Sequence, residues 1–227
     1  MARKARQETT KVLLLPLDRR DREKLVKVVE EAAEILCRGG VVVMPTETSY
    51  CIAADATREE AVKRLLELKG SGVNAWGVPI SVADLRMAQE YAVLSPEAEF
   101  IARSFMPGPV TIVAKKKNLP SIVGANDCVA IRISSHIAAR LLSQESGRPL
   151  ALTGANALGE PTIYKIEEIK KKFYGKVECI IDGGNLAPVI PSTVIDLSGP
   201  EPKVLREGPL SSKEILSQLK IFKQGSS

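Results

Sequence analysis

The sequence predicts an α/β protein, a single domain in which helices pack on a twisted sheet of mixed parallel and antiparallel strands. Apolar segments with the composition of strands alternate along the chain with amphipathic segments of helical period. No internal repeat or linker-like stretch interrupts this alternation. The 227 residues, 44% hydrophobic and 26% charged, suffice for one sizeable core and are somewhat short for two domains. Elements that interleave in this way pack as layers around one core.

The first half of the chain contains a strong amphipathic helix followed by a strong strand. Residues 21–38 carry apolar side chains at helical spacing, and Gly39-Gly40 ends the helix. Residues 41–44 are Val-Val-Val-Met, a composition typical of a central strand that is buried on both faces. Pro45 is expected to end this strand.

Three further helices are indicated by their capping residues. Thr57 and Glu60 have the spacing of a capping box, and Ser95 followed by Pro96 begins a second helix. Ser134 or Ser135 is expected to cap a third helix, which runs to residue 146. The other predicted elements are a loop at 70–78, helices at 165–174 and 211–219, and strands at 11–17, 79–82, 110–114, 128–133, 149–153, 177–181, 193–197 and 203–205.

Composition and charge limit the classes of protein that fit. Residues 1–10 are expected to be a flexible basic tail, residues 11–220 the domain and residues 221–227 a C-terminal tail. No apolar run is long enough for a membrane span or a signal peptide, so we expect a cytoplasmic protein with no membrane contact. The net charge is +5, and two lysine clusters, 115–117 and 170–172, fit either solvated surface or a polyanion footprint.

Motifs for metal binding and for nucleophilic catalysis are missing from the sequence. The four cysteines lie far apart and there is a single histidine, so we predict reduced thiols and no metal ligands. The phosphate-binding patterns G-x-x-x-x-G-K-[ST] and G-x-G-x-x-G do not occur, nor does the nucleophile elbow G-x-S-x-G. His136 is expected to cap a helix or to pack.

Five polar segments next to strands are the candidate site, because sheets of this kind bind ligands at strand ends. Residues 45–50 place three hydroxyls, a carboxylate and a phenol in six positions, which suits a small polar ligand. The alternative is that these side chains only satisfy their own backbone. The other four segments are 106–111, 153–156, 191–193 and 205–208.

Two basic residues and one small-residue segment indicate that the ligand carries phosphate. Lys69 and Arg206 lie at the edges of elements, where phosphates are commonly bound, although either could be solvated surface. Residues 153–156 offer backbone N–H groups and one amide for a phosphate or an adenine edge. From the residues alone, the sequence predicts a small-ligand or nucleotide site on an α/β sheet.

The order and spacing of these segments resemble the YrdC family of threonylcarbamoyl-AMP synthases over about residues 21–210. The resemblance implies the YrdC-like fold in a short single-domain form, without the additional C-terminal domain of longer members. The motifs that carry it are Pro-Thr-Glu-Thr-Ser-Tyr at 45–50, Pro-Gly-Pro-Val-Thr at 107–111, Val-Ala-Ile-Arg-Ile at 129–133, Ala-Asn at 155–156, Asp-Gly-Gly at 182–184, Pro-Ser-Thr-Val-Ile-Asp at 191–196 and Leu-Arg-Glu-Gly at 205–208.

The resemblance also implies a reaction. Threonine captures bicarbonate as a carbamate, which attacks the α-phosphate of ATP to give threonylcarbamoyl-AMP and pyrophosphate. A separate transferase complex then delivers the group to tRNA. Mg²⁺ would be bound mainly by the phosphates, so no protein metal ligands are implied.

Residue by residue, the resemblance assigns three sets of residues. Lys69, Thr48 and Asn156 would act closest to the chemistry. Threonine would be held by Thr46, Thr48, Tyr50, Thr111 and Arg132, and Arg132 could alternatively face the charged group of ATP. ATP would be held by Lys69, Asn156, Ser192, Thr193 and Arg206.

Three positions depart from the family pattern. Ser71 replaces the arginine of Lys-x-Arg, Gly154 replaces the serine of Ser-x-Asn, and Cys51 replaces the glycine after the tyrosine. These departures motivate a second hypothesis, in which the protein is a catalytically weak or silent paralogue that binds tRNA or double-stranded RNA through the same basic concave surface. A third hypothesis is a carbamoyl-adenylate enzyme of another maturation pathway.

Overall fold

The frame of the molecule is a mixed sheet. The computed structural model describes residues 9–225 except 17, 19–20, 71–73 and 158. Among these residues, eleven strands form one sheet in the order β1-β9-β2-β3-β8-β4-β7-β6-β10-β11, and β5 pairs with β6 at one side. The strands are β1 Lys11–Leu14, β2 Val42–Pro45, β3 Tyr50–Asp55, β4 Ile80–Ser81, β5 Ala92–Val93, β6 Val110–Lys116, β7 Cys128–Arg132, β8 Leu150–Gly154, β9 Cys179–Asp182, β10 Thr193–Asp196 and β11 Lys203–Arg206.

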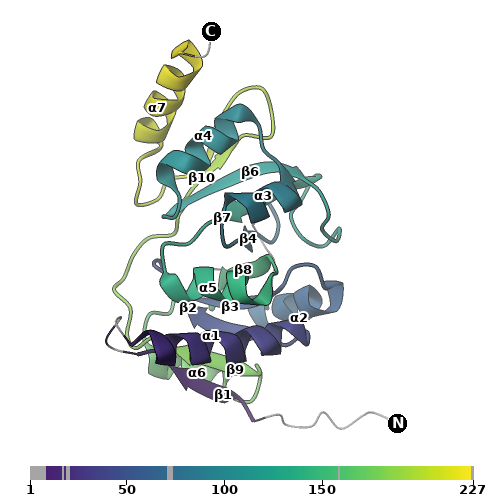
Figure 1. Ribbon diagram of the computed structural model, residues 1–227, viewed down its shortest axis with the longest axis vertical. Coiled ribbons are helices and arrows are strands. Elements are labelled where there is room, and N and C mark those ends of the chain that lie inside the picture. The colour runs from purple at the N-terminus through teal and green to yellow at the C-terminus, as the bar shows by residue number, and fades with distance from the viewer. Residues whose placement is uncertain (1–8, 17, 19–20, 71–73, 158, 226–227) are drawn as a thin grey trace.

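Seven helices in the described part of the chain cover this sheet. They are α1 Arg22–Cys37, α2 Glu59–Lys69, α3 Leu85–Tyr91, α4 Pro96–Phe105, α5 Ile137–Ser146, α6 Ile166–Phe173 and α7 Ser212–Gly225. In Figure 1, α1, α2, α5 and α6 surround β2, β3, β8 and β9 in the lower half, and α3, α4 and α7 lie beside β6 and β10 in the upper half. The predicted fold class, a mixed sheet with packed helices, is confirmed.

Parallel and antiparallel pairs both contribute to the sheet. β1 and β2 pair with β9 in parallel, and so do β4 with β7 and β10 with β6. β3 pairs antiparallel with β2 and with β8, and β6 pairs antiparallel with β7. Side chains along β3 alternate between two cores, with Tyr50 and Ile52 in the larger core and Cys51 and Ala53 in a second core beside α1 and α5.

Three elements were not predicted from the sequence. β3 follows a polar loop directly and contains small residues, so its strand character depends on burial between β2 and β8 rather than on propensity. α3 is short, and Asp84 caps it by accepting a hydrogen bond from Met87 N at 2.9 Å. β5 is a two-residue strand at the sheet margin.

Two predicted helix caps are wrong and one is confirmed. The N-cap of α2 is Arg58, since the Thr57 hydroxyl instead donates to Asp55 Oδ1 at 2.7 Å. The N-cap of α5 is His136, because the Ser134 hydroxyl donates to the Glu47 carboxylate instead. Ser95 does cap α4, where its hydroxyl accepts from Ala98 N at 3.2 Å.

Both ends of the domain differ from the predicted boundaries. Residues 1–8 of the expected tail lie outside the described residues. Thr10 is buried, and its hydroxyl donates to Val177 O at 2.6 Å, so it belongs to the domain. α7 continues to Gly225, past the boundary at residue 220, and Phe222 stacks on Phe100 of α4 with ring centroids 4.4 Å apart.

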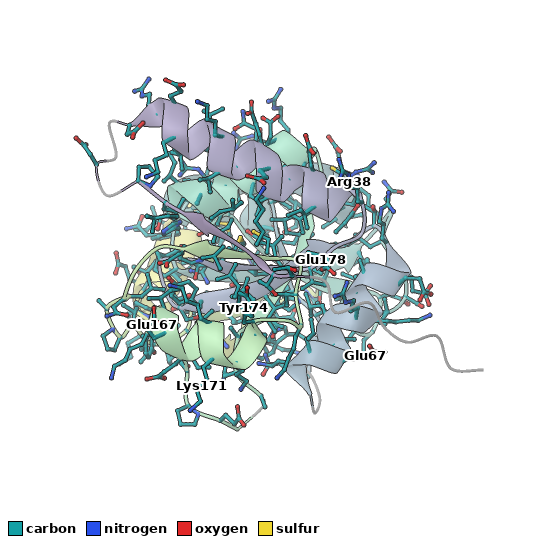
Figure 2. The ribbon with its side chains drawn as sticks, turned by 90° about the horizontal axis from the view of Figure 1, so that it is seen from below. Arg38, Glu67, Glu167, Lys171, Tyr174 and Glu178 are labelled. Carbon is teal, nitrogen blue, oxygen red and sulfur yellow. The ribbon has the colours of Figure 1, made fainter. Side chains whose placement is uncertain are left out.

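Three lysines of the two clusters contact other residues of the fold. Lys170 lies 2.9 Å from Asp182 and Lys172 lies 2.6 Å from Glu160. Lys116 donates to the Val123 carbonyl at 2.8 Å. Figure 2 shows acidic and basic side chains mixed on the face that carries α6, where Glu167 and Lys171 are labelled. None of the helices that the structure describes has the length and apolar character needed to cross a bilayer.

Candidate functional site

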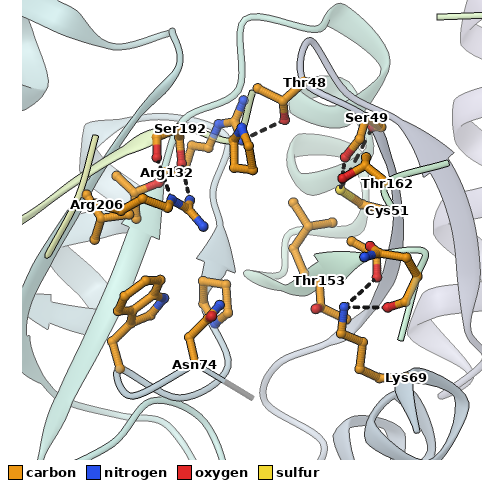
Figure 3. Close-up of a pocket in the computed structure, with 18 of the residues that line it drawn as sticks. Thr48, Ser49, Cys51, Lys69, Asn74, Arg132, Thr153, Thr162, Ser192 and Arg206 are labelled. Atoms are coloured by element: carbon orange, nitrogen blue, oxygen red, sulfur yellow. Dashed lines mark hydrogen bonds between the residues drawn. The ribbon is translucent and has the colours of Figure 1, made fainter. Parts of the chain in front are cut away.

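A cavity of about 230 Å³ brings together most of the polar segments that the sequence singled out. Figure 3 shows its walls, with Arg206, Ser192, Arg132 and Thr48 along one side and Cys51 and Lys69 along the other. Its polar lining consists of Thr48, Ser49, Lys69, Asn74, Thr111, Arg132, Thr153, Asn156, Thr162, Ser192 and Arg206. Three of these side chains are cationic, and the described lining contains no carboxylate.

The turn between β2 and β3 is organised by Thr46. This buried residue donates from its hydroxyl to Ser49 O at 2.8 Å and accepts from the N–H groups of Thr48 and Ser49, each at 3.2 Å. The hydroxyl is therefore used by the backbone, as the alternative interpretation of this loop expected. The same bonds hold Thr48 and Ser49 where they line the cavity. Thr46 thus shapes the loop, and Thr48 is the threonine that faces the cavity.

Arg132, at the end of β7, links this loop to the sheet. Its Nη1 donates to Thr48 Oγ1 at 3.2 Å, and its Nη2 lies 2.8 Å from Glu47 Oε1. The Glu47 carboxylate also accepts from Ser135 N at 2.9 Å and from the Ser134 hydroxyl. Burial by itself raises the pKa of Glu47, but the Arg132 charge and these hydrogen bonds together lower it below its ordinary value. The carboxylate is therefore ionised and paired at neutral pH.

Tyr50 lies in the main core rather than at the cavity. Its hydroxyl donates to Gly184 O at 2.7 Å and accepts from Gly183 N at 3.0 Å, and burial raises its pKa to about 12. The reason is strand alternation, because Tyr50 begins β3 and its neighbour Cys51 is the residue that faces the cavity. The Tyr50 hydroxyl thus fixes the Asp-Gly-Gly turn against the strand, and the threonine contact expected of Tyr50 stays a prediction.

Lys69 reaches the cavity from the last turn of α2. Its Nζ donates to Gly154 O at 3.1 Å and to Asn156 O at 2.5 Å, and burial lowers its pKa. Asn156 turns its own amide to Ala157 O at 3.2 Å and Glu160 O at 2.8 Å. Within the described residues, no carboxylate lies at ion-pair distance from Lys69. Its charge is held by neutral carbonyls.

Arg206, at the end of β11, is held in the same way on the opposite wall. Its Nε donates to Ser192 O at 2.9 Å and its Nη2 to Ser192 Oγ at 3.1 Å, and Ser192 Oγ lies 2.8 Å from Thr111 Oγ1. No described carboxylate lies within ion-pair distance of this guanidinium either. Burial, and after it the charge of Arg132, lower the pKa of Arg206.

Thr193 is the other expected contact that lies away from the cavity. It is fully buried, and its hydroxyl donates to the Leu210 carbonyl. Strand alternation again explains the difference, since Ser192 and Val194 line the cavity and Thr193 faces the opposite side of β10. The hydroxyl ties β10 to the segment that leads into α7.

The cavity also contains residues that sequence reasoning missed, chiefly Asn74, Trp76 and Thr162. Trp76 is the only tryptophan in the sequence, which was the one available signal. Arg206 lies over its ring, with the guanidinium carbon 5.4 Å from the ring centroid.

The structure describes the surroundings of two of the three positions that depart from the family pattern. Ser71 lies outside the described residues. Cys51 is buried at the cavity wall, and burial raises its pKa, so its thiol stays protonated at neutral pH. A Cβ added at Gly154 would lie 2.6 Å from Asn156 Oδ1, so the Asn156 amide occupies the space that a serine side chain would need.

Comparisons with known proteins agree on one family. The Sua5/YciO/YrdC family model, described as "Telomere recombination", matches residues 34–208. A threonylcarbamoyl-AMP synthase of Pyrococcus abyssi is 40% identical over 187 residues, which are 81% of this chain and 55% of that protein. This chain spans about half the length of that relative and of a Bacillus subtilis relative, also a threonylcarbamoyl-AMP synthase, of which it covers 55%.

Solved structures give the same result. P. abyssi Sua5, described as complexed with L-threonine, has a TM-score of 0.81 and 35% identity, covering 92% of this chain and 60% of that one. E. coli YciO has a TM-score of 0.79 and 25% identity, covering 92% and 99%. The resemblance seen in the motifs is confirmed, and the chain belongs to the Sua5/YciO/YrdC family.

Proposed function

We propose that the protein synthesises threonylcarbamoyl-AMP from L-threonine, bicarbonate and ATP, with release of pyrophosphate. The observation that carries the proposal is the charge of the cavity, whose described lining has three cations and no carboxylate. Two of the cations, Lys69 and Arg206, have only neutral partners among the described residues. A polyphosphate would supply the missing negative charge, since buried cations are stabilised by anions that they can also hydrogen-bond.

The two substrates would occupy different parts of the cavity. Threonine would bind near Thr48, Thr111 and Arg132, where hydroxyls and a guanidinium suit its amino and carboxylate groups. The P. abyssi relative with bound L-threonine supports this assignment at the level of the whole domain. ATP would contact Lys69 on one wall and Ser192 and Arg206 on the other.

The chemistry would need positioning and charge neutralisation rather than a nucleophilic side chain. The carbamate oxygen of the substrate attacks the α-phosphate, the bond to the bridging oxygen breaks, and pyrophosphate leaves with the electron pair. Lys69 and Arg206 would offset the charge that develops on the phosphates, and Asn156 would fix the loop that Lys69 contacts.

Mg²⁺ is the ion that would accompany ATP. In the described part of the chain, no group of three or more His, Cys, Asp or Glu side chains is placed to hold a metal ion. The cavity lining offers hydroxyls and amides instead, so the phosphates would provide most of the ligands of Mg²⁺. The product would pass to a transferase complex that modifies tRNA.

No observation on the described residues favours the RNA-binding alternative. Within the two lysine clusters, Lys170 and Lys172 lie near carboxylates of the same chain and Lys116 donates to a carbonyl. The curated relatives carry the names of synthases. The comparisons therefore give the alternative no support, and we do not propose it.

The experiment is a pyrophosphate-release assay with ATP, bicarbonate and L-threonine, combined with mass spectrometry of the adenylate. We expect release that requires all three substrates and a product with the mass of threonylcarbamoyl-AMP. Arg206→Gln should abolish most of it, whereas the control Arg103→Gln, on the exposed side of α4, should not. Release that is independent of threonine would refute the proposal.

A further inference from the structure

Trp76 lines the cavity and lies between an apolar surface and a cation. Its ring packs against a small cluster on the sheet formed by Val113, Ala130 and Val194. The guanidinium carbon of Arg206 lies 5.4 Å from the ring centroid, within the range of a cation–π contact. The indole thus packs on the sheet and contacts the Arg206 guanidinium.

Arg206 needs such a contact, because its environment is otherwise unfavourable for a cation. It is partly buried, its hydrogen bonds go to the carbonyl and hydroxyl of Ser192, and burial and the charge of Arg132 both lower its pKa. Without a carboxylate among the described residues to fix it, a long side chain of this kind would sample many rotamers. The two bonds to Ser192 and the ring of Trp76 together define one orientation over the cavity.

We infer that Trp76 is a positioning residue, whose ring holds the Arg206 guanidinium in the orientation that receives a phosphate group in the cavity. The inference rests on the proposed function, in which that group belongs to ATP. Trp76 acts through Arg206 in this arrangement, and the contact is to the phosphate-binding side chain rather than to the base. A held guanidinium loses less rotamer freedom on binding, which increases affinity.

The test measures binding by calorimetry with two probes, ATP and inorganic triphosphate, so that it needs no turnover. We expect Trp76→Leu to weaken both probes by roughly tenfold, the size of a partly desolvated cation–π contact, and Trp76→Phe to restore part of the loss. The affinity for L-threonine should not change. Tyr174→Leu, which removes an exposed aromatic ring on the face shown in Figure 2, is the control and should bind both probes as the wild type does.

A double-mutant cycle separates positioning from a merely structural role. In the Arg206→Gln background, Trp76→Leu should have no further effect on triphosphate affinity, because the residue through which it acts is gone. Equal losses in both backgrounds would overturn the inference. So would a loss for ATP but not for triphosphate, which would assign the ring to the nucleobase. A loss of threonine affinity that matches the loss of triphosphate affinity would also overturn it, and thermal melting identifies variants that fail to fold.

The single tryptophan provides a spectroscopic signature of the same contact. ATP should change the intrinsic tryptophan fluorescence of the wild type and leave that of Arg206→Gln nearly unchanged. If neither ATP nor triphosphate binds the wild type, the inference is wrong. If ATP and triphosphate bind and their affinity depends on Trp76 through Arg206, but no pyrophosphate is released, the proposed function is refuted and the inference stands. If the enzyme is active and Trp76→Leu leaves its ATP affinity unchanged, the inference is refuted and the proposed function stands.

Discussion

Two sides of the cavity hold their positive charge in opposite ways. Arg132 is paired with the Glu47 carboxylate at 2.8 Å, and two serines of the next segment complete the pair. Lys69 and Arg206 contact carbonyls, a hydroxyl and an aromatic ring, all neutral. On the paired side, the Glu47 carboxylate neutralises the Arg132 charge without a ligand. The unpaired side keeps a positive potential in the cavity and is therefore the side on which an anionic ligand changes the energy most.

The largest expected effect concerns the paired side. Glu47→Gln leaves the Arg132 charge buried without its counter-charge, so we expect a loss of about 3 kcal/mol in the free energy of unfolding at pH 7. The pKa of Glu47 is lowered in the folded state, so its contribution is complete above the ordinary value and is lost as the pH falls through the lower folded value. The difference between wild type and variant should shrink below about pH 4.5.

Urea denaturation between pH 3 and pH 7 measures this prediction. The control is Glu34→Gln, which breaks an exposed pair with Arg38 at 3.0 Å and should cost only about 0.3–0.5 kcal/mol. If both variants lost the same stability at pH 7, the Glu47–Arg132 pair would not be a structural element, and the contrast between the two sides would fail.

The next effect concerns the unpaired side. Lys69→Met removes a cation that has no described carboxylate partner, so we expect little change in stability and about a thirtyfold loss of ATP affinity, equal to about 2 kcal/mol. Lys63→Met, on the same helix but exposed and paired with Glu59, is the matched control and should leave ATP affinity unchanged. Calorimetric titration with ATP checks both variants. If the Lys69→Met protein binds ATP normally but is much less stable than the wild type, Lys69 stabilises the fold rather than the ligand, and the contrast between the two sides fails.

The smallest effect tests the packing next to Lys69. Gly154→Ser restores the family pattern, yet its Cβ would meet Asn156 Oδ1 at 2.6 Å, and Asn156 contributes a carbonyl to Lys69. We expect a loss of ATP affinity of about fivefold, or about 1 kcal/mol, because the Asn156 side chain must move and its amide nitrogen bonds the carbonyls of Ala157 and Glu160 in this loop. The control is Gly199→Ser, where an added Cβ meets nothing within 4 Å. Tighter ATP binding by Gly154→Ser would show instead that the serine hydroxyl is a contact this chain lacks.

Prediction from the sequence succeeded where local signals were strong. The helix at 21–38, the apolar strand before Pro45 and the cap at Ser95 are each determined by neighbouring residues, and each occurs close to the predicted place. It failed where long-range contacts decide. β3 is a strand because it lies between β2 and β8, and Ser134 does not cap α5 because its hydroxyl donates to Glu47, far away in the sequence.

The candidate site shows the same division. Chemical type and position were enough to select Lys69 and Arg206, and the family resemblance added Arg132; all three line the cavity. The face of each strand was harder to assign, and Tyr50 and Thr193 were placed one position away from the residues that line the cavity. A register error of one residue moves a side chain to the opposite face of a sheet.

By itself, the sequence determined the family, the mixed α/β fold class and the set of polar segments that meet at the cavity, because these depend on periodicity, composition and ordered motifs. The tertiary structure decided which charges are paired. Glu47 neutralises Arg132 across 85 positions of chain, while Lys69 and Arg206 receive only neutral partners among the described residues. Pairing depends on distances between atoms that are remote in the chain, and only the folded sheet sets these distances.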